Sequence, residues 1–283
     1  MSRTRPALDD ALVAVTGAAR GIGLATARAF VDAGACVALG DLDGELAARA
    51  AATLGARATG HQLDVTDKES FASFLGAAET SHGRALDVLV NNAGIMPNAA
   101  FLDQDERTDR QTMDVNVHGV IHGMRLALPG MVERRRGAVV NVASLAGKFP
   151  LQGLAVYNAS KYAVVGLTAA TRLEVAASGV HVGAVLPSAV RTELSSGIDL
   201  GVLPTVDPED IAGAVVRSVL TGRGEIAVPG YVGLAVAAAP LVPERVLGIV
   251  RRLARDDAAI SRVDDDVRRV YLDRVRAQGE SRG

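Results

Sequence analysis

A glycine-rich loop at Thr16–Gly23, with glycines at 17, 21 and 23, lies between a predicted strand and a predicted helix. Glycines allow a tight turn and let the backbone approach a diphosphate, which the free N–H groups of a helix start then bind. Asp41 ends the second predicted strand, 18 residues after Gly23. An acid at this distance accepts hydrogen bonds from the adenine ribose and repels a 2′-phosphate. We expect NAD as the cofactor, although the guanidinium of Arg20 could also reach a 2′-phosphate.

Tyr157 and Lys161 are a second pair whose spacing suggests chemistry. Because they are four residues apart on a predicted helix, their side chains share one face. A free tyrosine has a pKa near 10, and a nearby cation favours its phenolate. We expect Lys161 and an oxidised nicotinamide ring to lower the pKa of Tyr157 by about three units, which requires ~4 kcal/mol. Tyr157 would then be a general base for alcohol oxidation or a general acid for ketone reduction.

Ser144 follows the apolar run at 138–142, at the carboxyl end of a predicted strand. Open α/β sheets bind their ligands at this edge. We expect its hydroxyl to hydrogen-bond the substrate oxygen beside Tyr157 and to stabilise developing charge. A serine nucleophile is the competing interpretation, but Ala143 and Leu145 do not form a Gly-x-Ser-x-Gly elbow.

The elements that must position these residues alternate along the chain. Short apolar runs and longer helical patterns in turn predict βαβ units and a parallel sheet covered on both faces. We predict an α/β, Rossmann-like, doubly wound sheet of seven strands in three layers. The predicted strands are 12–15, 36–39, 58–63, 88–90, 138–142, 180–186 and 226–228, and the predicted helices are 23–33, 44–54, 70–80, 107–128, 155–177 and 208–220.

The chain is expected to form a single domain, with a dinucleotide-binding and catalytic core over 11–230 and a C-terminal extension over 231–283. The run at 226–243 has no charged residue, but prolines and glycines interrupt it, so a strand and a short helix explain it better than a membrane span. Peripheral membrane contact stays open. Later in the extension an apolar stripe predicts a helix packed on the core or on a partner subunit, with a tail over 278–283; the stripe is Val263, Val267, Val270, Tyr271 and Val275.

Composition excludes several classes of function. The net charge of −2 gives no field that would attract nucleic acid, and 49% hydrophobic with 22% charged residues is typical of a folded globular protein. The single cysteine, Cys36, cannot form an internal disulfide, and no secretion signal opens the chain, so we expect a cytoplasmic protein. The helical trio Asp114, His118 and His122 has a metal-pair spacing without further ligands, and we expect no functional metal.

With Asn91-Asn92-Ala93-Gly94, Asn116, Ser144 and Tyr157-x-x-x-Lys161 in this order, the chain resembles the short-chain dehydrogenase/reductase family over roughly 12–228. The resemblance implies that Lys161 also binds the nicotinamide ribose and that Asn116 orders a water that relays protons to it. It implies that Asp64 and Val65 contact the adenine, although Asp64 and Asn91 could equally be capping or turn residues. Further cofactor contacts are implied for Ile22, Asn91 beside the adenosine ribose, Ala93, Gly94, Pro187, and Val190 and Thr192 at the carboxamide.

One departure concerns the loop after the sixth strand, where Ser188 follows Pro187 in place of the family's usual glycine. This loss of backbone freedom leaves the course of the loop near the nicotinamide open.

These observations predict an NAD-dependent oxidoreductase that interconverts a secondary alcohol and a ketone. Apolar residues near the site, among them Phe149, Leu151 and Leu154 and several in 194–203, predict an apolar pocket for a steroid-like or long-chain substrate. An NADPH-dependent ketoreductase and a dinucleotide-binding redox sensor are the alternatives. The resemblance also implies a homodimer or homotetramer, with the long helix at 107–128 at a subunit contact.

Overall fold

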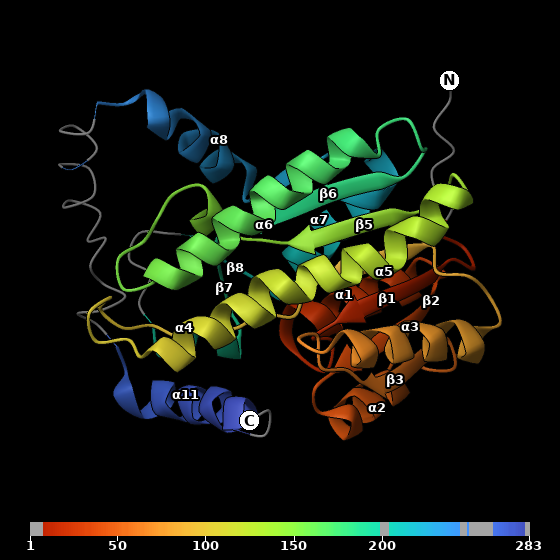
Figure 1. The fold of residues 1–283 in the computed structure, drawn as a ribbon, viewed down its shortest axis with the longest axis horizontal. Coiled ribbons are helices and arrows are strands. Elements are labelled where there is room, and N and C mark those ends of the chain that lie inside the picture. The colour runs from red at the N-terminus through yellow and green to blue at the C-terminus, as the bar shows by residue number, and fades with distance from the viewer. Residues whose placement is uncertain (1–7, 199–203, 244–247, 249–262, 281–283) are drawn as a thin grey trace.

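A parallel sheet of seven strands forms the centre of the protein, in a computed structural model that describes residues 8–198, 204–243, 248 and 263–280 (Figure 1). Its strand order, β3-β2-β1-β4-β5-β6-β9, reverses direction between β1 and β4. Ligands of open α/β sheets bind at such a reversal, beyond the carboxyl ends of the strands. The predicted doubly wound sheet is confirmed, with strands β1 (Leu12–Thr16), β2 (Cys36–Asp41), β3 (Ala58–Gln62), β4 (Val88–Asn91), β5 (Ala138–Val142), β6 (His181–Pro187) and β9 (Glu225–Val228).

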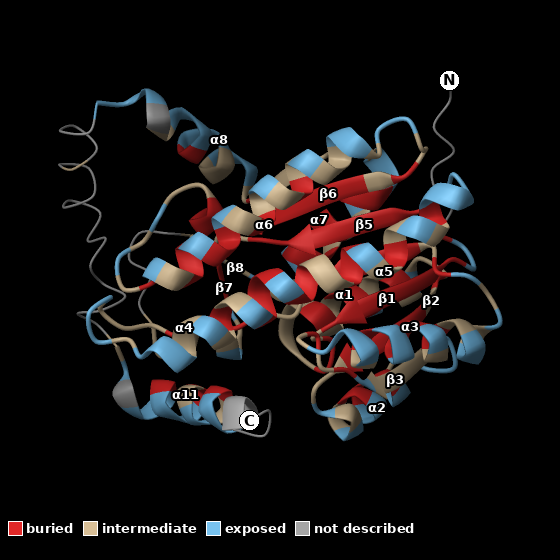
Figure 2. Cartoon of the chain, in the orientation of Figure 1, coloured by how far each residue is buried: buried red, intermediate tan, exposed pale blue. Residues whose placement is uncertain are grey.

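Helices cover both faces of this sheet and complete three layers (Figure 1). On one face, α1 (Gly21–Asp32), α2 (Gly44–Ala52) and α7 (Pro208–Thr221) contribute to one buried apolar cluster. On the other face, α3 (Lys68–His82), α5 (Gly119–Glu133) and α6 (Ala155–Glu174) contribute to a second cluster. The strands are buried on both sides, whereas the outer helix faces are exposed, as Figure 2 shows. Burial of these apolar faces, at about 25 cal/mol per Å², is the main driving force for this arrangement.

The helix predicted over 107–128 is interrupted. It forms α4 (Glu106–Met113), a π-helical turn at Asp114–His118 and then α5. π-turns inside helices occur frequently at functional sites, and this turn carries Asn116. A small second sheet, β7 (Ala189–Val190) with β8 (Thr205–Val206), stands beside the carboxyl end of β6.

The apolar run at 226–243 forms β9, helix α8 (Gly230–Ala238) and a 3₁₀ turn at Ala239–Leu241. Among the described residues, no helix has the length and apolar character that crossing a bilayer requires.

The last helix, α11 (Asp265–Glu280), includes residues 278–280 that were expected to be a tail. Tyr271 and Val275 of the predicted apolar stripe are buried, but Val267 and Val270 are 46% and 74% exposed. The charged side chain of Arg268 is buried in their place, with 1% exposure. These two valines do not pack on the core of their own chain, where carbonyl groups of neighbouring loops bind the Arg268 guanidinium; packing on a partner subunit stays a prediction for them.

Candidate active site

A cavity of about 520 Å³ lies at the carboxyl edge of the sheet, where the strand order reverses. It runs from the glycine loop, past the ends of β4 and β5, to the N-terminal turns of α6. Residues 93–96 after β4 and 187–195 after β6 form much of its wall. Of the predicted site residues, the wall contains Gly17, Arg20, Gly21, Ile22, Asp41, Val65, Ala93, Gly94, Ser144, Tyr157, Lys161, Pro187, Val190 and Thr192.

The glycine loop fits a dinucleotide diphosphate. Gly17 has a φ of +62°, and a Cβ atom there would lie 2.8 Å from the Cα atom of Ala93. Arg20 stands at the N-cap of α1 but its side chain does not cap the first N–H groups, which leaves them available to an anion. Gly23 lies outside the cavity wall, because it packs so closely on the loop that a Cβ atom would be 2.1 Å from the carbonyl oxygen of Gly17.

The carboxylate of Asp41 is fixed where β2 ends at the cavity wall. It accepts hydrogen bonds from the N–H of Ala19 at 3.1 Å and from the N–H of Asp43 at 3.2 Å. The guanidinium of Arg20 pairs instead with Glu193, at 3.0 Å between Nη1 and Oε2. The two residues that give opposite indications on cofactor choice therefore have different partners.

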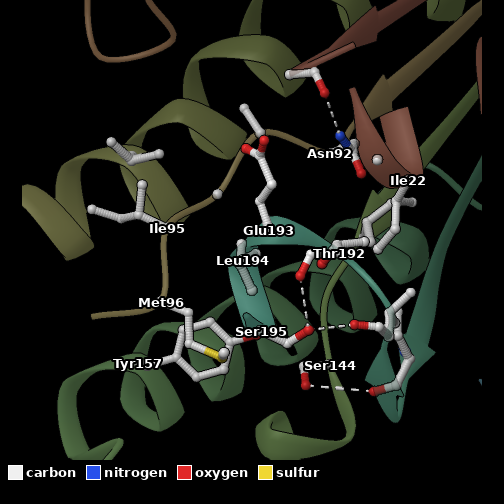
Figure 3. A pocket seen from close by; sticks show the side chains of 18 of the residues that line it. Ile22, Asn92, Ile95, Met96, Ser144, Tyr157, Thr192, Glu193, Leu194 and Ser195 are labelled. Atoms are coloured by element: carbon white, nitrogen blue, oxygen red, sulfur yellow. Dashed lines mark hydrogen bonds between the residues drawn. The ribbon is translucent and has the colours of Figure 1, made fainter. Parts of the chain in front are cut away.

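Ser144 and Tyr157 come together although they belong to different elements. Ser144 follows β5 and Tyr157 stands in the first turn of α6, buried to 7% exposure. The Ser144 hydroxyl lies 3.5 Å from the carbonyl oxygen of Pro187, and its proximity to the Tyr157 phenol lowers the pKa of Tyr157. Figure 3 shows both side chains on the same side of the cavity, with Met96 beside the Tyr157 ring. A substrate oxygen placed here can reach both hydroxyl groups.

The amine of Lys161 lies below the tyrosine ring. Its Nζ atom is 5.7 Å from the centroid of the Tyr157 ring and donates to the carbonyl oxygen of Val142 at 3.1 Å. Burial lowers the pKa of Lys161 to about 8, because the charged form loses its hydration.

The pKa of Tyr157 differs from the sequence expectation. The pKa of Tyr157 is raised to about 12, mainly by burial; Ser144 lowers it and the neighbouring Tyr271 raises it by smaller amounts. In the free protein Lys161 does not produce the expected lowering, because desolvation of the phenolate outweighs an amine at this distance.

Asn116 is buried and does not line the cavity. Its side chain accepts from the N–H of Ile95 at 2.9 Å and donates to Ile95 O and to the hydroxyl of Ser160. A Cβ atom on Gly94 would lie 3.2 Å from Asn116 Oδ1 and 3.7 Å from Lys161 Nζ. Gly94 therefore lies directly against the asparagine, and an added Cβ atom would require the Asn116 side chain to shift by a few tenths of an ångström.

Two residues with an expected adenosine role lie outside the cavity wall. Asp64 accepts hydrogen bonds from the N–H and the hydroxyl of Thr66, at 2.9 and 2.8 Å, in the turn before α3. Asn91 is buried in the sheet, where its amide donates to Asn141 Oδ1 at 2.9 Å. These contacts match the alternative interpretation of Asp64 as a turn residue, and they give the side chain of Asn91 a structural place in the sheet.

Comparison with known proteins decides the family. The short chain dehydrogenase profile matches residues 11–201, about two thirds of the chain. This chain belongs to the short-chain dehydrogenase family. Its members are nicotinamide-dependent oxidoreductases that act on CH–OH groups.

Individual relatives differ in their activities. The chain is 44% identical, over 59% of its length and 72% of the relative's, to the inactive 2-(S)-hydroxypropyl-CoM dehydrogenase 2 of Xanthobacter autotrophicus. It is 36% identical to the cis-4-hydroxycyclohexanecarboxylate dehydrogenase of Sinomonas cyclohexanicum, over 75% and 86% of the two chains. The crystal structure of the 3-ketoacyl-(acyl-carrier-protein) reductase of Brucella melitensis with NADH superimposes with a TM-score of 0.72 at 28% identity, over 78% and 97% of the chains.

Relative to the usual short-chain dehydrogenase pattern, Ser188 replaces a glycine. Its hydroxyl oxygen is buried, and no hydrogen-bond partner for it exists in the part of the chain that the structure describes. Its backbone N–H donates to Val228 O at 2.8 Å, so the loop still leaves β6 alongside β9.

Several wall residues were not predicted from the sequence as site residues. They include Met96, Glu193, Tyr271, Arg274 and Val275. The last three belong to α11, beyond the matched residues 11–201. Only the apolar periodicity that included Tyr271 and Val275 suggested that this helix is buried. Of the apolar residues expected near the substrate, Leu151, Leu154 and Leu194 line the cavity, Ile198 packs beside it, and Leu200 and Val202 lie outside the described residues.

Proposed function

We propose that this short-chain dehydrogenase uses NAD to interconvert a secondary alcohol and a ketone on a substrate with an apolar body. The observation that carries the proposal is that Ser144, Tyr157, Lys161 and the glycine loop line one cavity, with the Lys161 amine 5.7 Å from the Tyr157 ring centroid. A structural protein or a pure binding module has no need of a buried phenol and a buried amine around a space open to a ligand.

In this proposal the chain binds the substrate oxygen and moves one proton. Ser144 donates a hydrogen bond to that oxygen, and Tyr157 takes its proton in oxidation or returns one in reduction. Asn116 holds the π-turn beside Lys161. The amine of Lys161 passes protons onward from Tyr157. The bound dinucleotide supplies the hydride chemistry. The residues that would hold it are the glycine loop, Asp41, Ala93, Lys161, Val190 and Thr192.

The electrostatics of the adenosine end support NAD over NADP. Asp41 is held by two backbone N–H groups, so its carboxylate is preorganised for ribose hydroxyls. The charge of Arg20 is engaged by Glu193, which weakens its claim on a 2′-phosphate. A 2′-phosphate charge about 4 Å from the Asp41 carboxylate would cost up to ~4 kcal/mol at an effective dielectric constant near 20, which is enough for a large preference for NAD over NADP.

The apolar wall supports the substrate class. Met96, Leu151, Leu154 and Leu194 surround the space next to Tyr157. An NADPH-dependent ketoreductase is the second candidate, because a reductase of ketoacyl groups is among the similar structures. We further propose a cytoplasmic homo-oligomer, consistent with a single cysteine and with the family.

The test is a spectrophotometric scan of apolar secondary alcohols, and of the matching ketones, with NAD(H) and NADP(H) in parallel. The proposal expects turnover with NAD at a kcat/KM at least tenfold above that with NADP. Preference for NADPH in ketone reduction would establish the second candidate, and turnover only of sugars or polyols would refute the apolar substrate.

A further inference from the structure

We propose that the end of the cavity formed by α11 is an anion-binding subsite, and that the substrate is an apolar hydroxy acid whose carboxylate binds Tyr271 and Arg274. This inference rests on the proposed alcohol dehydrogenase function and deepens it. Three features of the described residues carry it: the hydroxyl of Tyr271, an excess of positive charge, and the apolar space between this end and Tyr157.

The Tyr271 hydroxyl is oriented but not fully used. Its oxygen accepts a hydrogen bond from the N–H of Met96 at 2.8 Å. Among residues 8–198, 204–243 and 263–280, no acceptor takes its proton. Burial raises the pKa of Tyr271 above its ordinary value, so the group stays a neutral donor at physiological pH. A donor fixed in a cavity wall is suited to bind an oxygen of a ligand.

Positive charge exceeds negative charge around this hydroxyl. Arg274 and Arg20 share one carboxylate, that of Glu193. The guanidinium of Arg268 lies 4.2 Å from the Tyr271 ring centroid, and that of Arg274 lies 5.5 Å from it. The acceptors that Arg268 finds in the described part of the chain are all neutral: Asn98 Oδ1 and the carbonyl oxygens of Met96, Leu194 and Ser196.

Of these three cations, Arg20 and Arg274 line the cavity and share Glu193, while Arg268 lies against the Tyr271 ring outside the lining; among the described residues, no second carboxylate pairs with any of them. A buried or half-buried charge without a counter-charge is costly, and a ligand anion would relieve it. Arg274 lines the cavity, and within the described part of the chain its one ion pair, with Glu193, leaves other guanidinium donors for a planar, bidentate contact with a carboxylate.

The space between Tyr271 and Tyr157 determines which substrate body fits between the carboxylate and the reacting hydroxyl. Met96 contacts both tyrosines: its N–H donates to the hydroxyl of Tyr271, and its side chain packs in the apolar cluster that contains Tyr157. Leu154, Leu194 and Val275 complete an apolar lining there. A compact hydrocarbon body with a hydroxyl at one end and a carboxylate at the other matches this order of groups.

The experiment compares three alcohols: 4-hydroxycyclohexanecarboxylate as both isomers, its methyl ester, and cyclohexanol. The ester keeps the shape and removes the charge. We expect wild-type kcat/KM to be at least tenfold higher for one isomer of the acid than for the matching ester. Arg274→Met should raise KM for the acid about tenfold or more, the loss expected for a hydrogen bond to a charged group, with at most a threefold effect on the ester. Tyr271→Phe should lower the acid-to-ester ratio of kcat/KM by a similar factor, because any effect through the pKa of Tyr157 is common to both substrates.

Two further variants control the interpretation. Arg276→Met removes a cation from the same helix at a side chain that is 68% exposed, and should leave the acid-to-ester ratio unchanged. Arg274→Lys keeps the charge and should retain part of the preference, which separates charge from folding if the methionine variant is unstable. Higher salt should reduce the preference for the acid.

The outcomes are distinct. Equal use of acid and ester by the wild type overturns the subsite. If Arg274→Met instead weakens NADH binding without changing the acid-to-ester ratio, the arginine serves the dinucleotide diphosphate and the inference is wrong. If neither the alcohols nor the matching ketones react with either cofactor while NADH still binds, the proposed function itself fails.

Discussion

Replacement of Arg268 by methionine should release α11 from the rest of the protein. Methionine keeps an apolar stem of similar length but removes every donor. The guanidinium binds Asn98 Oδ1 at 2.6 Å, Leu194 O at 2.8 Å and Met96 O, with Ser196 O more distant at 3.4 Å. Through Arg268, these bonds join α11 to the loop after β4 and to the loop after β7.

The size of the effect follows from these contacts. Each of the three short bonds contributes about 1 kcal/mol, net of the hydration that the guanidinium regains on undocking. Their removal should therefore lower the free energy that docks α11 by about 3 kcal/mol. Because stability is not uniform across a protein, this loss should appear as local undocking of α11 before it affects the sheet. A loss of 3 kcal/mol corresponds to about a 150-fold increase in the undocked population.

Amide hydrogen exchange measures that population directly. Protection of the amides around Tyr271 and Val275 should fall about 100-fold in Arg268→Met, while amides of β4 and β5 keep their rates. Arg269→Met is the matched control, since its side chain is 66% exposed and pairs only loosely with Asp266 at 3.6 Å. Exchange in α11 that changes by less than threefold would refute the reasoning that Arg268 holds this helix.

Three other substitutions test separate parts of the account. Gly17→Ala should abolish dinucleotide binding, measured by NADH fluorescence, because its Cβ atom would lie 2.8 Å from Ala93 Cα at a φ that favours glycine; retained binding would contradict the close approach. Asp41→Asn should narrow the NAD-over-NADP ratio of kcat/KM by at least tenfold, and an unchanged ratio would show that another group selects the cofactor. Ser188→Ala should raise the free energy of unfolding by about 1 kcal/mol in denaturant titrations, because it removes a buried hydroxyl without a partner; a loss of stability would mean that the hydroxyl is bonded.

Sequence patterns predicted the parts of this protein that depend on local spacing. The seven strands follow from short apolar runs between helical patterns, and the glycine loop and the Tyr157–Lys161 pair follow from fixed offsets. The π-turn at Asp114–His118 was not predictable, because the apolar periodicity continues across it. The burial of Arg268 was missed because its acceptors are carbonyl oxygens of distant loops, which have no signature in side-chain types.

Long-range burial also explains the expectations that changed in the site. The side chain of Asn91 turns into the sheet because Asn141 lies beside it on the neighbouring strand, at the register partner position. The pKa of Tyr157 rises rather than falls because packing by Met96 and Leu154 removes water from the phenol, an effect that one-turn spacing to Lys161 does not reveal.

That raised pKa gives the catalytic proposal a definite pH dependence. With a pKa of about 12, Tyr157 is protonated at pH 8 in the free protein, and forming the phenolate there costs about 5 kcal/mol. Alcohol oxidation should therefore speed up as pH rises, with an apparent pKa below 12 when oxidised cofactor is bound, since its positive ring favours the phenolate.

The most direct measurement is kcat/KM for alcohol oxidation at saturating NAD from pH 6 to 10, for the wild type and for Tyr157→Phe, with the NADH dissociation constant measured for both. The account predicts a wild-type rate that rises with pH, a loss of at least 1,000-fold in the variant, within the range of general acid–base catalysis, and NADH affinities within threefold of each other. A variant that keeps activity within tenfold of the wild type, with the same rise with pH, would contradict the claim that Tyr157 carries the proton.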